Sequence, residues 1–145
     1  MYYDKVLSEP INSHRKESNK MEKRVICSDK SVKTVGPFST ATELNGTIYL
    51  SGITAVDPKT NVLSGDVSEQ AEKVLTIMKD VLEEAGSSMD NVLKCTVFLN
   101  DVNDFAAVNA VYARFFKAPY PARICVQAAK IPLGALVEID AIAYR

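Results

Sequence analysis

One amphipathic segment, between Asp66 and Gly86, constrains the fold of this chain more than any other. Its apolar residues recur at the three- and four-residue spacing of a helix that buries one side. They are Val67, Ala71, Val74, Leu75, Met78, Val81, Leu82 and Ala85. Asp66 with Glu69 three residues later predicts a capping box at the start, and Gly86 suits the C-terminal stop. Such a helix needs a second layer to cover its apolar side.

The residues that could supply this layer form short strand-like runs before and after the helix. Residues 24–27 and 91–99 are rich in strand formers. Residues 40–44 and 47–51 flank Asn45-Gly46, which favours a tight hairpin because both turn residues tolerate positive φ. We therefore predict at least three strands before the helix and one directly after it.

A second helix is expected after residue 99, with Asn103 as its cap and with Pro119 and Pro121 ending it. Its apolar stripe consists of Phe105, Val108, Tyr112 and Phe115 or Phe116. Two helices without regular βαβ alternation favour an α+β fold, with one mostly antiparallel sheet of six strands and both helices on one face. The other sheet face would be semi-apolar, so we expect further subunits to cover it.

The last strands, residues 121–128 and 136–143, are predicted to pair as a hairpin that reverses near residues 131–132. Alternation along a strand would then place Arg123 and Cys125 on one face, opposite Glu138 and Asp140. An arginine on a rigid strand can bind a carboxylate or a phosphate with two parallel hydrogen bonds. The simpler alternative is a surface or interface arginine that pairs with Asp140.

Glu138 lies between Val137 and Ile139, inside an apolar strand. It is either a salt-bridged interface residue or a carboxylate that orients or deprotonates a water. Cys125 is more often a packing residue than a nucleophile at such a position, because no histidine of the folded part is available to activate it.

Two more sites remain open between a structural and a functional interpretation. Asn109 lies on or beside the stripe of the second helix, where its amide is either a satisfied buried group or a ligand contact. Ser51-Gly52 ends a strand, where the backbone could approach a ligand closely or form a bulge.

Composition limits the class of protein. The 145 residues carry a net charge of −1, which does not favour nucleic-acid binding, and no apolar run is long enough to span a bilayer. Three cysteines without CxxC spacing favour reduced thiols and an intracellular compartment, either the cytoplasm or an organelle such as the mitochondrion. The one histidine cannot build a metal site alone. Residues 1–20 are expected to be a flexible extension, and residues 21–145 the folded domain.

Several separated motifs together resemble the YjgF/YER057c/UK114 family, also called the Rid (reactive intermediate deaminase) family, and its RidA branch most. These motifs are Gly36-Pro37-Phe38-Ser39, Ser51-Gly52, Asn103-Asp104-Phe105, Val108-Asn109, Tyr112, Phe115-Phe116, Pro121-Ala122-Arg123 with Cys125, and Val137-Glu138-Ile139. The resemblance implies a chorismate-mutase-like fold and a homotrimer with clefts between subunits. It also implies cofactor-independent hydrolysis of imines and enamines such as 2-aminoacrylate, that is, a 2-iminobutanoate/2-iminopropanoate deaminase.

By this resemblance, Arg123 binds the substrate carboxylate, and Glu138 lies near the attacking water with help from the backbone at Cys125. Asn109 and Ser51-Gly52 line the cleft, and Phe38 belongs to a loop that closes over it. The chain departs from the family at two positions, since Phe38 replaces a frequent tyrosine and Ile53 a frequent glutamine. Two alternative functions are a non-catalytic trimer that binds small carboxylates such as 2-keto acids, and an endoribonuclease or translation inhibitor, against which the acidic pI argues.

Overall fold

The computed structural model describes residues 21–31 and 33–145, so the prediction for residues 1–20 lies outside the described part. The strands and helices follow in the order β1 (Arg24–Ile26), β2 (Ala41–Leu44), β3 (Thr47–Thr54), α1 (Val67–Glu84), β4 (Val92–Leu99), α2 (Phe105–Phe115), β5 (Ala122–Gln127) and β6 (Val137–Tyr144). Short 3-10 turns occur at η1 (Met89–Asn91), η2 (Val102–Asp104) and η3 (Pro132–Gly134).

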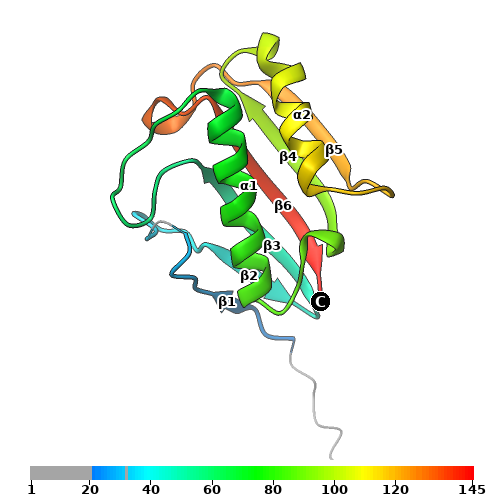
Figure 1. Cartoon of the computed structure of the whole chain (residues 1–145). Helices are drawn as coiled ribbons and strands as arrows, with labels where there is room; N and C mark the ends of the chain where they lie inside the picture. Colours follow the sequence, from blue (N-terminus) through cyan, green and yellow to red (C-terminus); the bar gives the residue numbers. More distant parts are fainter. Residues whose placement is uncertain (1–20, 32) are drawn as a thin grey trace, which may run out of the picture.

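The strands form one six-stranded sheet in the order β1-β2-β3-β6-β4-β5. Every neighbouring pair is antiparallel except β4 and β5, which are parallel. Both helices lie side by side on one face of the sheet, as Figure 1 shows. The predicted α+β architecture, with a mostly antiparallel sheet and two helices on one face, is therefore confirmed.

The predicted hairpin between β5 and β6 is wrong. β4 lies between these two strands, so Arg123 pairs with Cys95, and Cys95 pairs with Ala141. The strand that follows a helix here returns parallel to β4 at the edge of the sheet, which a local pattern of alternating residues does not reveal. As a consequence, Arg123 and Cys125 face the helices, whereas Glu138 and Asp140 face the opposite side.

Helix α1 has the predicted ends. Asp66 accepts a hydrogen bond from the Glu69 backbone N–H at 2.9 Å, and the Glu69 carboxylate accepts one from the Asp66 N–H at 2.8 Å. At the other end Gly86 has a φ of +78°, and the Ser87 N–H reaches the Leu82 carbonyl at 2.8 Å. These contacts satisfy backbone groups that the helix itself leaves unpaired, so α1 is well defined at both ends.

Helix α2 starts later than predicted. Asp104 rather than Asn103 is its first flanking residue, and the Asp101 side chain accepts a hydrogen bond from the Asn103 N–H at 2.9 Å to cap the preceding turn η2. The buried residues of α2 are Val108, Val111 and Tyr112. They pack with α1 and the helix-facing side of the sheet in one core.

The helix-free face of the sheet is semi-apolar, as expected. Tyr49, Ile124 and Val126 on this face are each more than two-fifths exposed. The prediction that Arg123 and Cys125 lie on this helix-free face is wrong, because β4 lies between β5 and β6 in the sheet. No helix among the described residues is long and apolar enough to cross a membrane.

Candidate functional site

Arg123 projects from the edge strand β5 toward helix α2. Its guanidinium carbon lies 4.7 Å from the centre of the Tyr112 ring and 5.5 Å from the centre of the Phe105 ring. Aromatic faces attract a guanidinium at such distances. The half-buried arginine is thus supported from the helix side by two rings of α2.

The guanidinium of Arg123 has no hydrogen-bond or ion-pair acceptor among the described residues, and two aromatic rings lie against it instead. The alternative that it pairs with Asp140 is wrong. Asp140 lies on the other face of the sheet, where it accepts a hydrogen bond from the Thr96 backbone N–H at 2.9 Å. A half-buried arginine with unused donors is suited to bind a small anion.

Asn109 comes four residues after Phe105 and three residues before Tyr112, so it shares their side of α2. The half-buried amide of Asn109 makes no hydrogen bond within residues 21–31 and 33–145. The first of the two interpretations, a satisfied buried amide, is therefore not supported. The position of Asn109 in the helix places its amide on the side of α2 that carries the two rings beneath Arg123.

The cysteines near Arg123 are neutral thiols. Burial raises the pKa of Cys95 to about 11. Burial also raises the pKa of Cys125, and the positive charge of Arg123 offsets this only in part. A nucleophilic cysteine needs a lowered pKa, so packing is the better interpretation of Cys125, which lies against the core.

Tyr112 is the third titratable group beside Arg123, after the two cysteines. Burial, together with the neighbouring Cys95 thiol, raises the pKa of its hydroxyl. The hydroxyl is buried but forms no hydrogen bond of normal geometry. What Tyr112 offers Arg123 is thus the face of its ring.

Glu138 lies on the helix-free side of β6, paired with Phe98 of β4 and Thr54 of β3. Burial raises the pKa of its carboxyl above the ordinary value of 4.5, and the negative charge of Asp140 adds to the effect. The carboxylate packs over Gly52, where a Cβ would overlap Oε1 and lie 2.9 Å from Cδ. Any side chain at this position would therefore displace the Glu138 carboxylate.

Ser51 lies in an irregular part of β3, where the register with β6 shifts between Leu50 and Ile53. This confirms the bulge that the sequence left open. The Ser51 hydroxyl donates to the Ser39 carbonyl at 2.6 Å, and the Ser51 N–H donates to the Thr40 carbonyl at 3.0 Å. These bonds hold the segment that carries Phe38 next to the end of β3.

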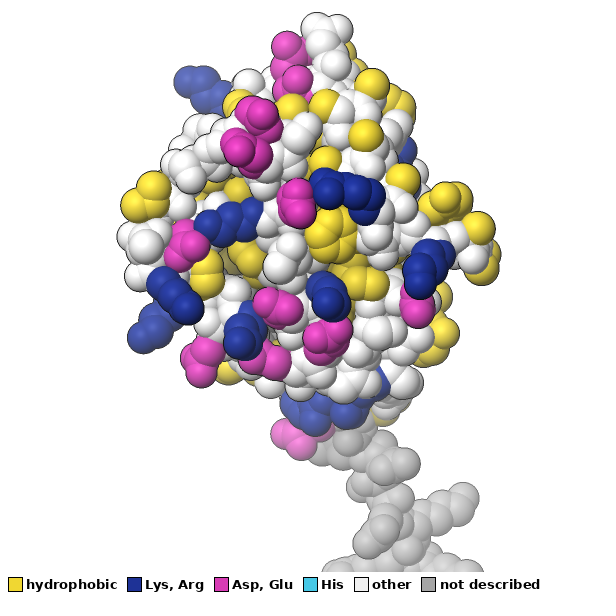
Figure 2. All heavy atoms as spheres, in the orientation of Figure 1, with side chains coloured by type: hydrophobic (Ala, Val, Ile, Leu, Met, Phe, Trp, Pro, Cys, Tyr) yellow, Lys and Arg dark blue, Asp and Glu magenta, His cyan; other side chains and the backbone are white. Residues whose placement is uncertain are grey.

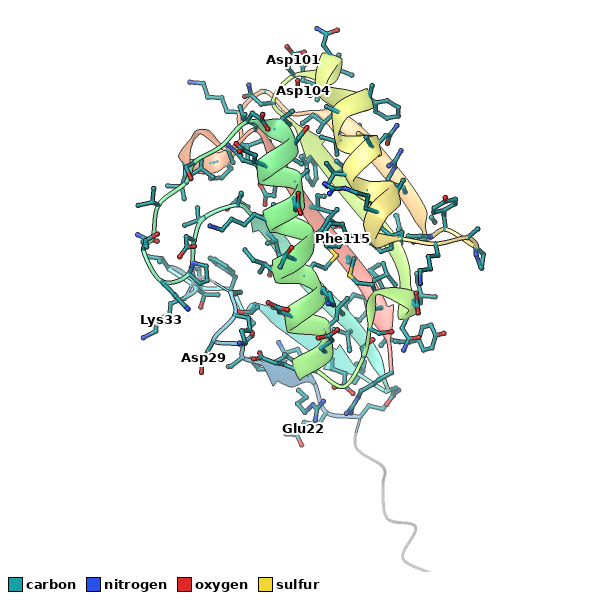
Figure 3. The ribbon with its side chains drawn as sticks, in the orientation of Figure 1. Glu22, Asp29, Lys33, Asp101, Asp104 and Phe115 are labelled. Atoms are coloured by element: carbon teal, nitrogen blue, oxygen red, sulfur yellow. The ribbon has the colours of Figure 1, made fainter. Side chains whose placement is uncertain are left out.

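A pocket of about 500 Å³ opens at this end of β3. Phe38, Ser51 and Gly52 line it, together with Ile53 and Thr54. Lys33 also lines the pocket, and Figure 3 shows this residue on the side of the molecule away from α2 and Phe115.

The structure therefore divides the predicted site residues into two groups. The arginine half-site consists of Arg123, Asn109 and Cys125, on the helix side near the β5 edge. The glutamate half-site consists of Glu138, Gly52, Ser51 and Phe38, around the end of β3. Arg123 and Glu138 project from opposite faces of the sheet, so one chain does not bring the two half-sites together.

No group of three or more histidine, cysteine, aspartate or glutamate side chains within the described part is placed to hold a metal ion. Sequence reasoning missed the two rings beneath Arg123, although the spacing of Phe105, Asn109 and Tyr112 on one side of a helix was a usable signal. It also missed Leu133 as a pocket residue, for which no local pattern gave a signal.

Known proteins that are similar in sequence and in fold identify the family of this chain. Residues 28–145 match the family described as Endoribonuclease L-PSP. A RutC family protein of Pyrococcus abyssi is 41% identical over 126 residues, covering 86% of this chain and 99% of the relative. The human protein named 2-iminobutanoate/2-iminopropanoate deaminase is 43% identical over 124 residues, covering 85% and 90% of the two chains. The crystal structure of Escherichia coli TdcF with bound serine superimposes with a TM-score of 0.80 at 38% identity, covering 84% of this chain and 98% of TdcF.

Proposed function

Since this chain belongs to the Endoribonuclease L-PSP family, the YjgF/Rid family of imine deaminases and their relatives, we propose that it hydrolyses 2-imino acids to 2-keto acids and ammonia. Enamines such as 2-aminoacrylate first tautomerise to the imine. Water then adds to the imine carbon while the nitrogen takes up a proton. The resulting carbinolamine expels ammonia as the C–N bond breaks, and its hydroxyl becomes the keto oxygen.

The observation that carries this proposal is the unpaired guanidinium of Arg123. A half-buried charge with no protein acceptor is costly to keep unless a ligand completes it. The planar fork of an arginine matches the carboxylate that every 2-imino acid carries. Arg123 would therefore anchor the substrate, and the Asn109 amide is placed to assist at the same side of α2.

Glu138 is the proposed partner of the attacking water. Its raised pKa brings the carboxyl closer to the operating pH, which suits a group that accepts a proton in one step and returns it in the next. The imine carbon is already electrophilic, so orientation of water and carboxylate supplies most of what the reaction needs. No metal or cofactor is required in this scheme.

The two half-sites can act together only if a second chain contributes one of them. We propose a homotrimer in which the arginine half-site of one subunit meets the glutamate half-site of its neighbour. The semi-apolar helix-free face, with Tyr49, Ile124 and Val126 exposed, supports its burial between subunits. The three free cysteines agree with the proposed cytoplasmic compartment, where thiols stay reduced.

A coupled assay tests the activity. A pyridoxal-phosphate-dependent dehydratase generates 2-aminoacrylate, and the release of pyruvate is compared with spontaneous hydrolysis in buffer. We expect clear acceleration by the wild type and at least about a 100-fold lower kcat/KM for Arg123→Ala, because two charge-assisted hydrogen bonds are lost. Arg114→Ala is the matched control, since Arg114 of α2 pairs with Glu72 outside both half-sites. Equal rates for wild type and buffer would refute the proposal.

A second candidate is a non-catalytic module that binds small carboxylates, which the TdcF structure with bound serine favours. Affinity for pyruvate that depends on Arg123, without any turnover by the wild type, would select it. An RNA-directed function is less well supported. Figure 2 shows acidic and basic side chains interspersed over the helix-bearing face, and RNA binding with little salt dependence would count further against it.

A further inference from the structure

The pocket of the glutamate half-site is larger than the reaction centre alone requires. Its volume of about 500 Å³ falls within the range of small-molecule sites. Two of its lining residues adjoin Glu138: Gly52 is in contact with the glutamate side chain, and Thr54 pairs with Glu138 in the sheet. A substrate whose imine carbon lies near Glu138 would therefore extend its side chain into this space.

A large part of the pocket wall is apolar, beside polar residues such as Lys33, Thr40 and Asn61. The apolar side chains that line the pocket are Val35, Phe38, Ile53, Val56, Ile77, Pro132 and Leu133. Val35, Phe38 and Leu133 are also strongly exposed, between 55% and 88%. Apolar side chains left in water around a concave site indicate a ligand with an apolar group.

Leu133 provides an independent indication. Its φ of +63° lies in the left-handed region, which a leucine adopts only at a cost in free energy. The side chain is 76% exposed and lines the pocket, so the strain gains no burial in the core. Asparagine would adopt this backbone more readily, and the leucine therefore points to a role for its apolar side chain.

Ile53 and Phe38 also make the pocket wall apolar. Ile53 is almost fully buried at the pocket wall, and Phe38 presents a ring without a hydroxyl to the pocket. Neither side chain has a polar atom that could hydrogen-bond a small polar substrate.

We propose, as an extension of the function proposed above, that this pocket selects imino acids with a bulky apolar side chain. The preferred substrates are the imines of leucine, methionine and phenylalanine, and the small imine of alanine is a poorer one. Each methylene that fills an apolar pocket changes kcat/KM by about tenfold or more. The leucine-derived imine should thus exceed the alanine-derived imine by at least about tenfold in kcat/KM.

An L-amino-acid oxidase that generates each imine in situ, with catalase to remove peroxide, provides the test. Imines of alanine, leucine and glutamate are compared through the decrease in trapped imine. Leu133→Asn is the variant of choice, because asparagine tolerates the positive φ and the fold should not suffer. We expect it to lower the ratio of kcat/KM for the leucine-derived imine to kcat/KM for the alanine-derived imine about tenfold.

The matched control is Leu93→Asn, which makes the same change at an exposed leucine that does not line the pocket. It should leave the preference unchanged. Equal or higher kcat/KM for the alanine- or glutamate-derived imine in the wild type would overturn the inference, as would an unchanged preference in Leu133→Asn. The proposed function itself would survive either outcome, and only the absence of turnover with every imine would refute it.

Discussion

The guanidinium carbon of Arg123 lies 4.7 Å from the centre of the Tyr112 ring, and this contact links the edge strand β5 to helix α2. The ring occupies one side of the guanidinium without using any of its N–H donors. A carboxylate acceptor from the protein would instead compete with the substrate. The aromatic support therefore orients the arginine and leaves its hydrogen-bonding edge for a ligand.

Replacement of the Tyr112 ring should weaken substrate binding. For Tyr112→Leu we expect KM and the inhibition constant of pyruvate to rise roughly 2- to 30-fold, which corresponds to a cation–π contribution of about 0.5–2 kcal/mol. Tyr112→Phe keeps the ring and removes a buried hydroxyl without a hydrogen bond, so its KM should stay unchanged and its stability should not fall. In an Arg123→Ala background, Tyr112→Leu should have no further effect on pyruvate binding. A further loss in that background would show that the tyrosine does not act through the arginine.

The raised pKa of Glu138 should appear in the pH profile of kcat. If the ionised carboxylate orients or deprotonates water, the rate rises with pH through the raised pKa, so the acidic limb lies above 4.5. Asp140→Asn removes the neighbouring negative charge and should move this limb to lower pH, although burial keeps part of the shift. Glu138→Gln should abolish the limb and reduce kcat by roughly 10²- to 10⁴-fold. A limb that persists in Glu138→Gln would assign it to another group.

Gly52→Ala offers a way to displace the Glu138 carboxylate without replacing it. The added methyl group would overlap Oε1, and the flexible end of the glutamate can move aside, so the melting temperature should change little. Misplacement of a catalytic group by about 1 Å reduces the rate by roughly 100-fold, and we expect a loss of that size. Full activity in a folded Gly52→Ala enzyme would argue against a role for the carboxylate in its present position.

A prediction about stability concerns Glu43, a buried carboxylate held by Arg145 at 2.9 Å from Nε and by Arg24. Burial alone would raise its pKa, but the hydrogen bonds and charges of the two arginines outweigh this effect, and the pKa is lowered. Because the pKa of Glu43 is lower in the folded protein than the unfolded value of 4.5, the ionised carboxylate stabilises the fold above pH 4.5. This stabilisation is lost as the pH falls toward the pKa of the folded state. Thermal melts of Glu43→Gln should therefore show a weaker loss of melting temperature below pH 4.5 than those of the wild type. Parallel curves for both proteins would contradict this assignment.

Local sequence signals predicted the elements well. Asn45-Gly46 produced the expected turn between β2 and β3, with both residues at positive φ, and Asp66 and Glu69 formed the expected capping box. Such features depend on neighbours within a few residues, so the sequence contains their cause directly.

Strand order was not predictable in the same way. β5 and β6 are close in sequence, but the parallel pairing of β4 with β5 across α2 places β4 between them. Arg123 and Glu138 were therefore assigned to one face, and the division into two half-sites could not be foreseen. β5 is also an edge strand in which Ile124 and Val126 are exposed while Arg123 is half-buried, so its pattern does not mark the core side.

The most direct test of the composite site is complementation between two inactive variants. Arg123→Ala and Glu138→Gln chains are co-expressed with different tags, and hybrid oligomers are purified and assayed with 2-aminoacrylate. Every hybrid trimer, whichever variant supplies two of its chains, has one site in three with an intact arginine from one subunit and an intact glutamate from its neighbour. Recovery of roughly a third of wild-type kcat by the purified hybrids, with each variant alone inactive, is the expected result. Hybrid oligomers as inactive as the single variants would contradict a site shared between chains.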